Sequence, residues 1–156
     1  MKTVNQVDIS FLSVSGNEAF ARAAAVAFLL SADPTVNDIS DVKTALSEAV
    51  TNSIIHAYKE TTGKVYVSMK LTDERAVIIK VRDKGSGIAD VEKAMEPLFS
   101  TGGEEQAGIG FSVMQSFSDS LKVKSAPGKG TTVTIVKKLS SKDDIKNITV
   151  KKHERE

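Results

Sequence analysis

KVYVSMKLTDERAVIIKVRDKGSG, residues 64–87, is the stretch of this sequence that decides the fold. Apolar and polar residues alternate over 64–71 and again over 75–82, which is the two-residue period of half-buried β-strands. The short segment 72–74 between the two runs is long enough for a tight turn, so we expect an antiparallel hairpin. The second strand runs directly into Asp83 and a glycine-containing loop, which sets a carboxylate at the end of a strand.

The segment before this hairpin predicts one strand, over 4–11, and two helices. Ser15 followed by Glu18 has the pattern of a capping box, and the helix that it opens should end before Pro34. Its apolar residues at helical spacing are Phe20, Ala23, Ala24, Ala27 and Leu30. A second helix should begin at Ser40-Asp41. Its apolar stripe is Val42, Ala45, Leu46, Ala49, Val50, Ile54 and Ala57.

The segment after the hairpin predicts a short helix over 91–95, a loop over 97–107, and a longer helix that follows Gly108. Strands are expected at 121–125 and 131–138. This order of elements indicates an α+β fold, a two-layer α/β sandwich with a mixed, mostly antiparallel sheet. We expect Phe11, Phe20, Phe28 and Phe117 in its core.

Length and composition set the outer limits. The 156 residues suit one domain, which we place at 1–139, followed by a charged, flexible C-terminal tail at 140–156. Cysteine is absent, which excludes disulfide scaffolds, thiolate zinc sites and thiol nucleophiles. With 21 Lys and Arg against 20 Asp and Glu, the balance gives no argument for nucleic acid or an acidic membrane as partner. No apolar run is long enough for a membrane span, so a soluble, cytoplasmic protein is expected.

The first motif with chemical content is Glu48-x-x-x-Asn52 in the second predicted helix. A spacing of four residues places both side chains on one helix face, one turn apart. Carboxylate and amide oxygens are hard ligands that suit Mg²⁺, and a carboxylate can also act as a general base. Taken alone, the pair is more often an ordinary solvated helix face.

Glycines mark the other three motifs. Asp83-x-Gly85-x-Gly87 follows a strand, where the carboxylate can accept from an exocyclic amino group and the glycines can admit a flat ring. Gly108-x-Gly110-Phe111 opens a predicted helix whose N–H groups would favour phosphate, with residues 99–107 as a lid. Gly128-x-Gly130-Thr131 enters the last strand with a hydroxyl. Each motif alone also fits an ordinary turn.

Together, the four motifs resemble in order and placement the boxes of the nucleotide-binding family of gyrase, heat-shock protein 90, histidine kinases and MutL. The resemblance covers residues 5–138 and implies the Bergerat-type ATP-binding fold, with ATP or ADP and Mg²⁺ as ligands. Residues 47–58, SEAVTNSIIHAY, resemble the anti-sigma factor branch of that family. Residues 97–101 and Phe20-Ala21-Arg22 are similar to its sporulation members rather than its general-stress members.

That branch implies a dual function. The protein would bind and inhibit a sporulation sigma factor, and would use ATP to phosphorylate a serine of the anti-anti-sigma antagonist. The resemblance also implies a homodimer that forms through the sheet and the first helix, where Ala19, Ala23 and Ala27 would allow close packing.

The resemblance assigns a role to each matching residue. Glu48 would be the general base, Asn52 the Mg²⁺ ligand, and Arg22 the contact to the sigma factor. Asp83 would accept from the adenine amino group, with Gly87 and Thr131 nearby. The full set of expected nucleotide contacts is Asn52, Asp83, Gly85, Gly87, Ser100, Thr101, Gly108, Gly110, Phe111 and Thr131.

One departure from the family pattern leaves alternatives open. Gln106 stands where these proteins usually carry a lid arginine, and an amide brings no positive charge to a γ-phosphate. A nucleotide-gated binding module with weak or absent kinase chemistry is therefore the second interpretation. A sensor histidine kinase catalytic domain is a third, although 156 residues leave no room for a separate phosphoacceptor domain, and His56 is better explained as a packed helix residue.

Overall fold

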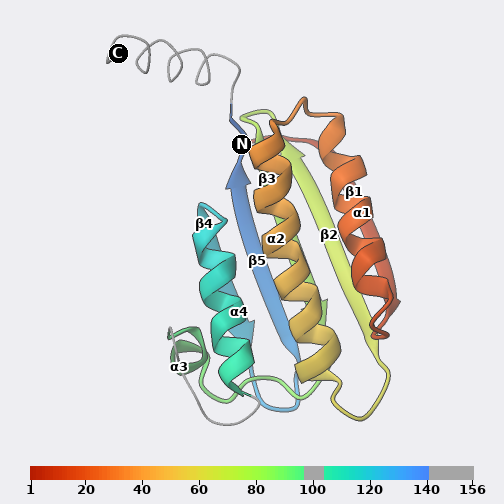
Figure 1. The fold of residues 1–156 in the computed structure, drawn as a ribbon, viewed down its shortest axis with the longest axis vertical. Coiled ribbons are helices and arrows are strands. Elements are labelled where there is room, and N and C mark those ends of the chain that lie inside the picture. The colour runs from red at the N-terminus through yellow and green to blue at the C-terminus, as the bar shows by residue number, and fades with distance from the viewer. Residues whose placement is uncertain (97–103, 141–156) are drawn as a thin grey trace.

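A computed structural model describes residues 1–96 and 104–140 as two layers, a sheet covered on one face by helices (Figure 1). The strands are β1 (Thr3–Leu12), β2 (Lys64–Thr72), β3 (Ala76–Asp83), β4 (Ser120–Ser125) and β5 (Thr131–Lys138). The helical elements are α1 (Asn17–Leu30), α2 (Val36–Asn52), a π-helical turn η1 (Ser53–Ala57), α3 (Val91–Met95) and α4 (Glu104–Ser116). This arrangement confirms the predicted α+β sandwich.

The sheet has the strand order β1-β2-β3-β5-β4, and every pairing among the described residues is antiparallel. The predicted hairpin is β2–β3, in which Val67 pairs with Val81 and Met69 with Ile79. All four of these side chains are buried on the helix side. Since the sheet is antiparallel, its other face is free to meet water, and that face carries the polar half of each strand.

Helix α2 lies across the middle of the sheet, with α1 and α4 on opposite sides of it (Figure 1). Five of the seven residues in its predicted stripe are buried: Val42, Ala45, Leu46, Ala49 and Val50. Phe111 and Met114 of α4 and Phe28 and Leu29 of α1 complete this core. None of the described helices is both long enough and apolar enough to cross a membrane.

Helix α2 begins earlier than predicted. Its N-cap is Thr35 rather than Ser40, because Thr35 and Asp38 form a complete capping box. The Thr35 hydroxyl accepts from the Asp38 N–H at 3.0 Å, and the Asp38 carboxylate accepts from the Thr35 N–H at 3.1 Å. This reciprocal pair satisfies two backbone donors that a helix start otherwise leaves open.

Helix α1 differs from the prediction in its cap and in its buried face. Its N-cap is Gly16 without a side-chain hydrogen bond, because Glu18 instead contacts Ser47 of α2 and pairs with Arg22 at 3.6 Å. The side chain of Phe20, predicted to be in the core, is 54% exposed, whereas Phe28 is buried. Apolar residues therefore occupy two faces of this helix, and the sequence could not tell which face meets the sheet.

Two further predictions change with the packing of side chains. Phe117, also expected in the core, is 37% exposed just beyond the end of α4. Helix α4 begins at Glu104, before the predicted start after Gly108, because residues 104–107 are good helix formers and two of them are acidic.

A buried cluster of hydrogen-bonded polar groups lies at the end of the sandwich where β5 ends. The Asp38 carboxylate, 1% exposed, also accepts from the Ser140 N–H at 3.1 Å and from its hydroxyl at 3.1 Å. The Arg75 guanidinium donates to the carbonyls of Ala32 at 2.7 Å and Ser140 at 3.0 Å. Ser140, the first residue of the expected tail, is thus tied to the domain, and residues 141–156 lie outside the described residues.

Removing the Asp38 carboxylate should therefore destabilise the whole domain. We expect Asp38→Ala to lower the free energy of unfolding by about 3 kcal/mol, since the carboxylate's half of the capping box and the buried bonds to Ser140 are lost together. Asp41→Ala is the matched control, because Asp41 forms a partly exposed ion pair with Lys137 at 3.0 Å and should contribute less than about 1 kcal/mol. Urea unfolding of both variants measures the difference, and equal losses of unfolding free energy would show that this polar cluster is not stabilising.

Candidate functional site

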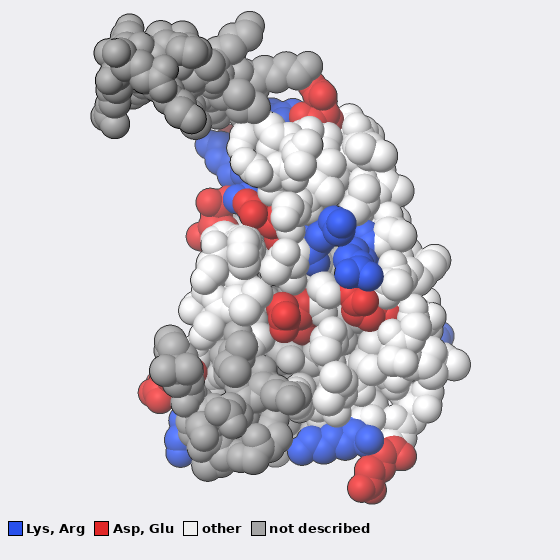
Figure 2. All heavy atoms as spheres, in the orientation of Figure 1, with Lys and Arg blue, Asp and Glu red and all other residues white. Residues whose placement is uncertain are grey.

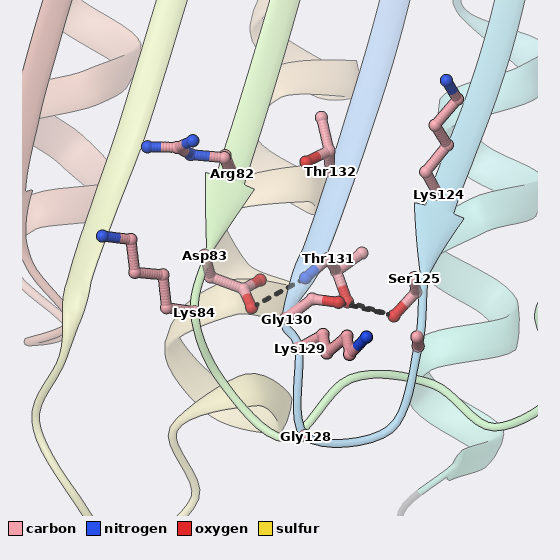
Figure 3. Close-up of a pocket in the computed structure, with 11 residues that line it drawn as sticks. Arg82, Asp83, Lys84, Lys124, Ser125, Gly128, Lys129, Gly130, Thr131 and Thr132 are labelled. Atoms are coloured by element: carbon pink, nitrogen blue, oxygen red, sulfur yellow. Dashed lines mark hydrogen bonds between the residues drawn. The ribbon is translucent and has the colours of Figure 1, made fainter.

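Asp83 lies at the end of β3 with its side chain turned into the molecule, and only 4% of the residue is exposed. Its carboxylate accepts from the Gly85 N–H at 3.0 Å, the Thr131 N–H at 3.2 Å and the Ser53 hydroxyl at 3.0 Å. Figure 3 shows the carboxylate directed from β3 toward Thr131 on β5. One side chain thus joins β3, β5 and the turn that follows α2.

Burial raises the pKa of the Asp83 carboxyl above its usual value, while the hydrogen bonds from Gly85, Ser53 and Thr131 oppose that rise. Desolvation is the largest of these effects, because it disfavours the charged form. The carboxylate therefore remains a strong acceptor, and protonation will remove part of that capacity at a higher pH than for an ordinary aspartate.

Helix α2 continues into a π-helical turn, η1, whose residues form the side of the site opposite Asp83 and Thr131. A π turn is one residue wider than an α turn, and such turns are frequent at functional sites. In this turn, Ser53 is buried and reaches Asp83, and His56 is half-buried. Burial, and secondarily the positive charge of Lys59, lowers the pKa of His56, so its imidazole is neutral at neutral pH.

The glycines of the site let backbone segments approach one another closely. A Cβ on Gly85 would collide with the carbonyl of Ala57 in η1, and one on Gly87 with the carbonyl of Ala126. A Cβ on Gly130 would collide with the carbonyl of Asp83. Gly87 and Gly130 also have φ values of +74° and +80°, which L-residues rarely adopt. Packing between loops thus accounts for these glycines without any ligand.

Two hydroxyl groups that sequence reasoning missed hold these loops in place. The Ser125 hydroxyl accepts from the Ile88 N–H at 2.8 Å and lies 2.8 Å from the Thr131 hydroxyl. The Tyr58 hydroxyl accepts from the Lys84 N–H at 2.7 Å and donates to the Lys64 carbonyl at 2.8 Å. Ser53 is the third missed residue, and its position directly after Asn52 was the one available signal.

A cavity of about 60 Å³ lies between α2, η1, β3, β5 and α4. It brings together five of the predicted nucleotide contacts, which are Asn52, Asp83, Gly87, Phe111 and Thr131. His56 and Ser53 line it as well. Cavities that hold drug-sized ligands are several times larger, on the order of 300–1,000 Å³. This cavity by itself is therefore smaller than a nucleotide.

Asn52 lines this cavity, Glu48 lies beside it, and both face Gly110 of α4. A Cβ built on Gly110 would lie 3.2 Å from both terminal atoms of Asn52 and 3.2 Å from Glu48 Oε2. The Asn52 Nδ2 is buried and has no hydrogen-bond partner among the described residues. A carboxylate and an unsatisfied amide at one point suit Mg²⁺ and a phosphate, because Mg²⁺ typically takes one or two protein oxygens and completes its shell with water and phosphate.

The remaining predicted contacts are placed as follows. Gly85 packs on η1, and Gly108 and Gly110 lie within the first two turns of α4 rather than at its start. In a regular helix the N–H groups at those positions are engaged with carbonyls one turn earlier, so they do not form an open phosphate cradle in this arrangement. Ser100 and Thr101 lie outside the described residues. Arg22 lies on α1, on the far side of α2 from α4 (Figure 1).

Comparison with known proteins agrees with this geometry. The family model described as "Histidine kinase-like ATPase domain" matches residues 14–137, which defines the class of the domain. Two solved structures share the fold. They are the RsbU and RsbW domains of a Mycobacterium tuberculosis protein (TM-score 0.66, 21% identity, 88% of this chain, 33% of that chain) and a histidine kinase domain from Erythrobacter litoralis (TM-score 0.53, 23% identity, 67% and 46%).

Curated relatives narrow the class. The anti-sigma F factor of Caldanaerobacter subterraneus is 51% identical over 138 residues, 88% of this chain and 96% of the relative. That of Bacillus subtilis is 44% identical over 138 residues, 87% and 94% of the two chains. The chain therefore belongs to the anti-sigma F factor family.

Two glycines with the same backbone angle allow a direct test of the loop packing. Gly87 and Gly128 both have φ +74°, but a Cβ on Gly128 meets open space. We expect Gly128→Ala to cost about 1 kcal/mol of unfolding free energy from the backbone conformation alone. Gly87→Ala should cost roughly 3 kcal/mol, because the Ala126 backbone must also move. Equal costs in urea unfolding would contradict the close packing of these loops.

Proposed function

We propose that this chain is an anti-sigma factor that holds sigma factor F inactive in the cytoplasm. We further propose that it uses ATP to phosphorylate a serine of the anti-anti-sigma antagonist. The observation that carries this proposal is that Asn52 on α2 and Asp83 on β3, which are far apart in the sequence, line one cavity, and that Glu48 lies one helix turn before Asn52 and also faces Gly110. Membership of the anti-sigma F factor family supports the same function.

Asp83 would recognise the adenine. Its buried carboxylate can accept from the exocyclic amino group while Thr131 and Gly87 border the ring. Ser53 and the Thr131 N–H already hold the carboxylate in place, so its orientation costs little when nucleotide binds. Bound Mg²⁺, held through Asn52 and phosphate oxygens, would supply charge neutralisation at the phosphates.

Glu48 would act as the general base one helix turn before Asn52. In the transfer, the serine Oγ forms a bond to the γ-phosphorus as the bond from that phosphorus to the β,γ-bridging oxygen breaks. ADP leaves with that oxygen, and the serine proton passes to the Glu48 carboxylate. Positioning accounts for most of the catalysis in such transfers, which suits a site built on a rigid helix and strand.

Nucleotide binding would require the start of α4 to move away from α2. The cavity of about 60 Å³ is too small for a nucleotide, and Gly110 packs directly against Glu48 and Asn52. Gly108 and Gly110 lie within the first seven residues of α4, and each weakens the helix by roughly 1 kcal/mol relative to alanine. The start of α4 is thus well suited to unwind and to free the N–H groups of the glycine box for phosphate.

The surface of α1 would contact the sigma factor, and α1 together with the sheet, at its edge strand β1, would contact a second subunit. Arg22 is partly exposed and held by Glu18, and the neighbouring Phe20 leaves more than half of its surface in water. Ala19, Ala23 and Ala27 are exposed on the same helix, which permits the close approach of a second copy in a homodimer. An apolar helix face in water indicates an interface.

The second candidate function is a nucleotide-gated anti-sigma module with little kinase chemistry. Gln106 brings no cation to the lid, and Lys84 does not replace it. The Lys84 ammonium lies 5.4 Å from the Tyr66 ring, on the open face of the sheet, away from Glu48. Measured phosphate transfer decides between the two functions.

Two variants separate the enzymatic activity from sigma-factor binding. We expect Glu48→Gln to lose at least about a hundredfold in transfer of labelled γ-phosphate to the antagonist, as for loss of a general base, and to retain sigma-factor binding. Arg22→Glu should show the reverse, with weakened capture of the sigma factor and continued transfer. Transfer by Glu48→Gln at the wild-type rate would remove Glu48 as the base, and absence of transfer in the wild type would leave the binding module.

The affinity for ADP should fall as the solution is acidified, beginning above the pH range of an ordinary aspartate. Burial raises the pKa of Asp83, so the accepting carboxylate is lost as pH falls through that raised value. The stability of the fold should change with pH in the opposite direction. Because burial favours protonated Asp83, its contribution to the free energy of unfolding is present at low pH and declines as pH rises through the raised pKa.

Calorimetric titration with ADP from about pH 7 down to the range of an ordinary aspartate, about pH 4, measures this effect. His56 also lines the cavity and is the competing titratable group, so His56→Gln is the control and should keep the acid loss. An affinity that does not change with pH in either protein would contradict the role of Asp83 as acceptor.

A further inference from the structure

The face of the sheet that the helices leave open carries a concentration of positive charge. Lys80 and Arg82 on β3 and Lys122 and Lys124 on β4 project from it and are exposed. Lys84 and Lys129 lie at the edge where these strands meet their loops. The whole chain has a formal charge of +1, so this face is far more basic than the average of the molecule. On the helix face, acidic and basic side chains are interspersed (Figure 2).

These cations stand in two rows on either side of β5. In the sheet register, Arg82 and Lys124 flank Thr132. Two residues further along β5, Lys80 and Lys122 flank Thr134. Side chains two residues apart on a strand are separated by about 6.6 Å, and strands on either side of a third by about 9.6 Å. We call this surface of four cations and two threonines the basic track. Figure 3 shows Arg82, Thr132 and Lys124 on it, seen with the helices behind the sheet.

The basic track is also hollowed. A cleft of about 670 Å³ is lined by Arg82, Lys84, Lys124 and Lys129, and a second cleft of about 430 Å³ continues from Arg82 and Thr132 to Lys80. Two carboxylates line these clefts. Asp83 turns inward to its three donors, and Asp8 lies on β1, beyond the track. The ion pairs Glu18–Arg22 and Asp41–Lys137 include no cation of the track, and no described carboxylate pairs with one.

We infer that the basic track binds an extended, acidic segment of a partner protein, separate from the nucleotide site and from the α1 surface. A segment in extended conformation presents its side chains at the same two-residue spacing as the sheet. Glutamates or aspartates at alternate positions would therefore meet successive cations of one row. Threonine hydroxyls along β5 can donate to the same carboxylates. Charge complementarity of this kind increases the association rate and the selection of partners.

The single aromatic residue that lines these clefts argues against single-stranded nucleic acid as the occupant. Proteins that bind single strands combine cations with exposed aromatic faces on which bases stack. The Tyr66 ring has the Arg82 guanidinium at 4.8 Å and the Lys84 ammonium at 5.4 Å from its centroid, so cations occupy its vicinity. The track thus offers charge and hydroxyl groups without a free stacking platform.

A fluorescence anisotropy titration of the full chain tests the inference with a labelled heptapeptide that carries glutamate at every second position. We expect Lys80→Glu/Lys122→Glu to weaken its binding about tenfold and added salt to weaken wild-type binding, because the contacts are exposed charge pairs. Lys43→Glu, an exposed charge reversal on α2 at the helix face, is the matched control and should change the affinity less than about twofold.

Three outcomes would overturn the inference. They are no binding of the acidic peptide by the wild type, equal weakening by the track and control variants, and tighter binding of a thymidine oligonucleotide than of the peptide. ADP titration of the same variants should give the wild-type affinity, since neither lysine lines the nucleotide cavity. Loss of peptide binding with retained ADP binding therefore separates this surface from the proposed kinase site.

Discussion

Burying a carboxylate is unfavourable unless donors replace the water that it loses, and Asp83 obtains those donors from three different parts of the chain. Ser53 approaches from the end of α2, Gly85 from the loop after β3, and Thr131 from the start of β5. Each contact requires the others to be in place, because a half-satisfied buried charge is costly. The close loop packing at Gly85, Gly87 and Gly130 follows from this requirement, since the segments that supply the donors must approach within contact of one another.

This constraint divides the site into a fixed part and an adaptable part. The sheet, α2 and η1 hold Asp83, Asn52 and Thr131 through buried apolar contacts and hydrogen bonds. Helix α4 completes the cavity from the other side with Phe111, but its start contains two glycines and covers the unsatisfied amide of Asn52. In the proposed function, recognition of the base would rest on the fixed part, and access for the phosphates would depend on one helix end.

The sequence predicted the features that depend on local pattern. The alternation over 64–82 identified the β2–β3 hairpin and placed Asp83 at a strand end, and the spacing of Glu48 and Asn52 placed them on one helix face. It did not predict features in which two similar residues compete for one contact. Ser40 and Thr35 are both good caps, and the contact between Thr35 and Asp38 decides between them. Phe20 and Phe28 are equally apolar, and only the packing of α1 exposes one and buries the other.

The glycines are the most instructive case. Room for a flat ring is the reason that the sequence suggests for Gly85 and Gly87, whereas the structure shows close backbone packing at both positions and at Gly130. Each is required by a neighbouring backbone carbonyl. The π-helical turn was likewise invisible, because its five residues have the composition of an ordinary helix end.

That π-helical turn makes the chain sensitive to length at this point. The residues before the turn are oriented by the packing of α2 in the core. Ala57 is oriented instead by a loop contact, in which its carbonyl accepts from the Ser86 N–H at 3.0 Å. The extra residue in the turn reconciles the two. A substitution at the exposed Ile55 would disturb little, but a one-residue deletion would rotate either the helix face that carries Glu48 and Asn52 or the loop contact out of place. Within this family, insertions and deletions should therefore avoid residues 53–57 even where the identities of those residues drift.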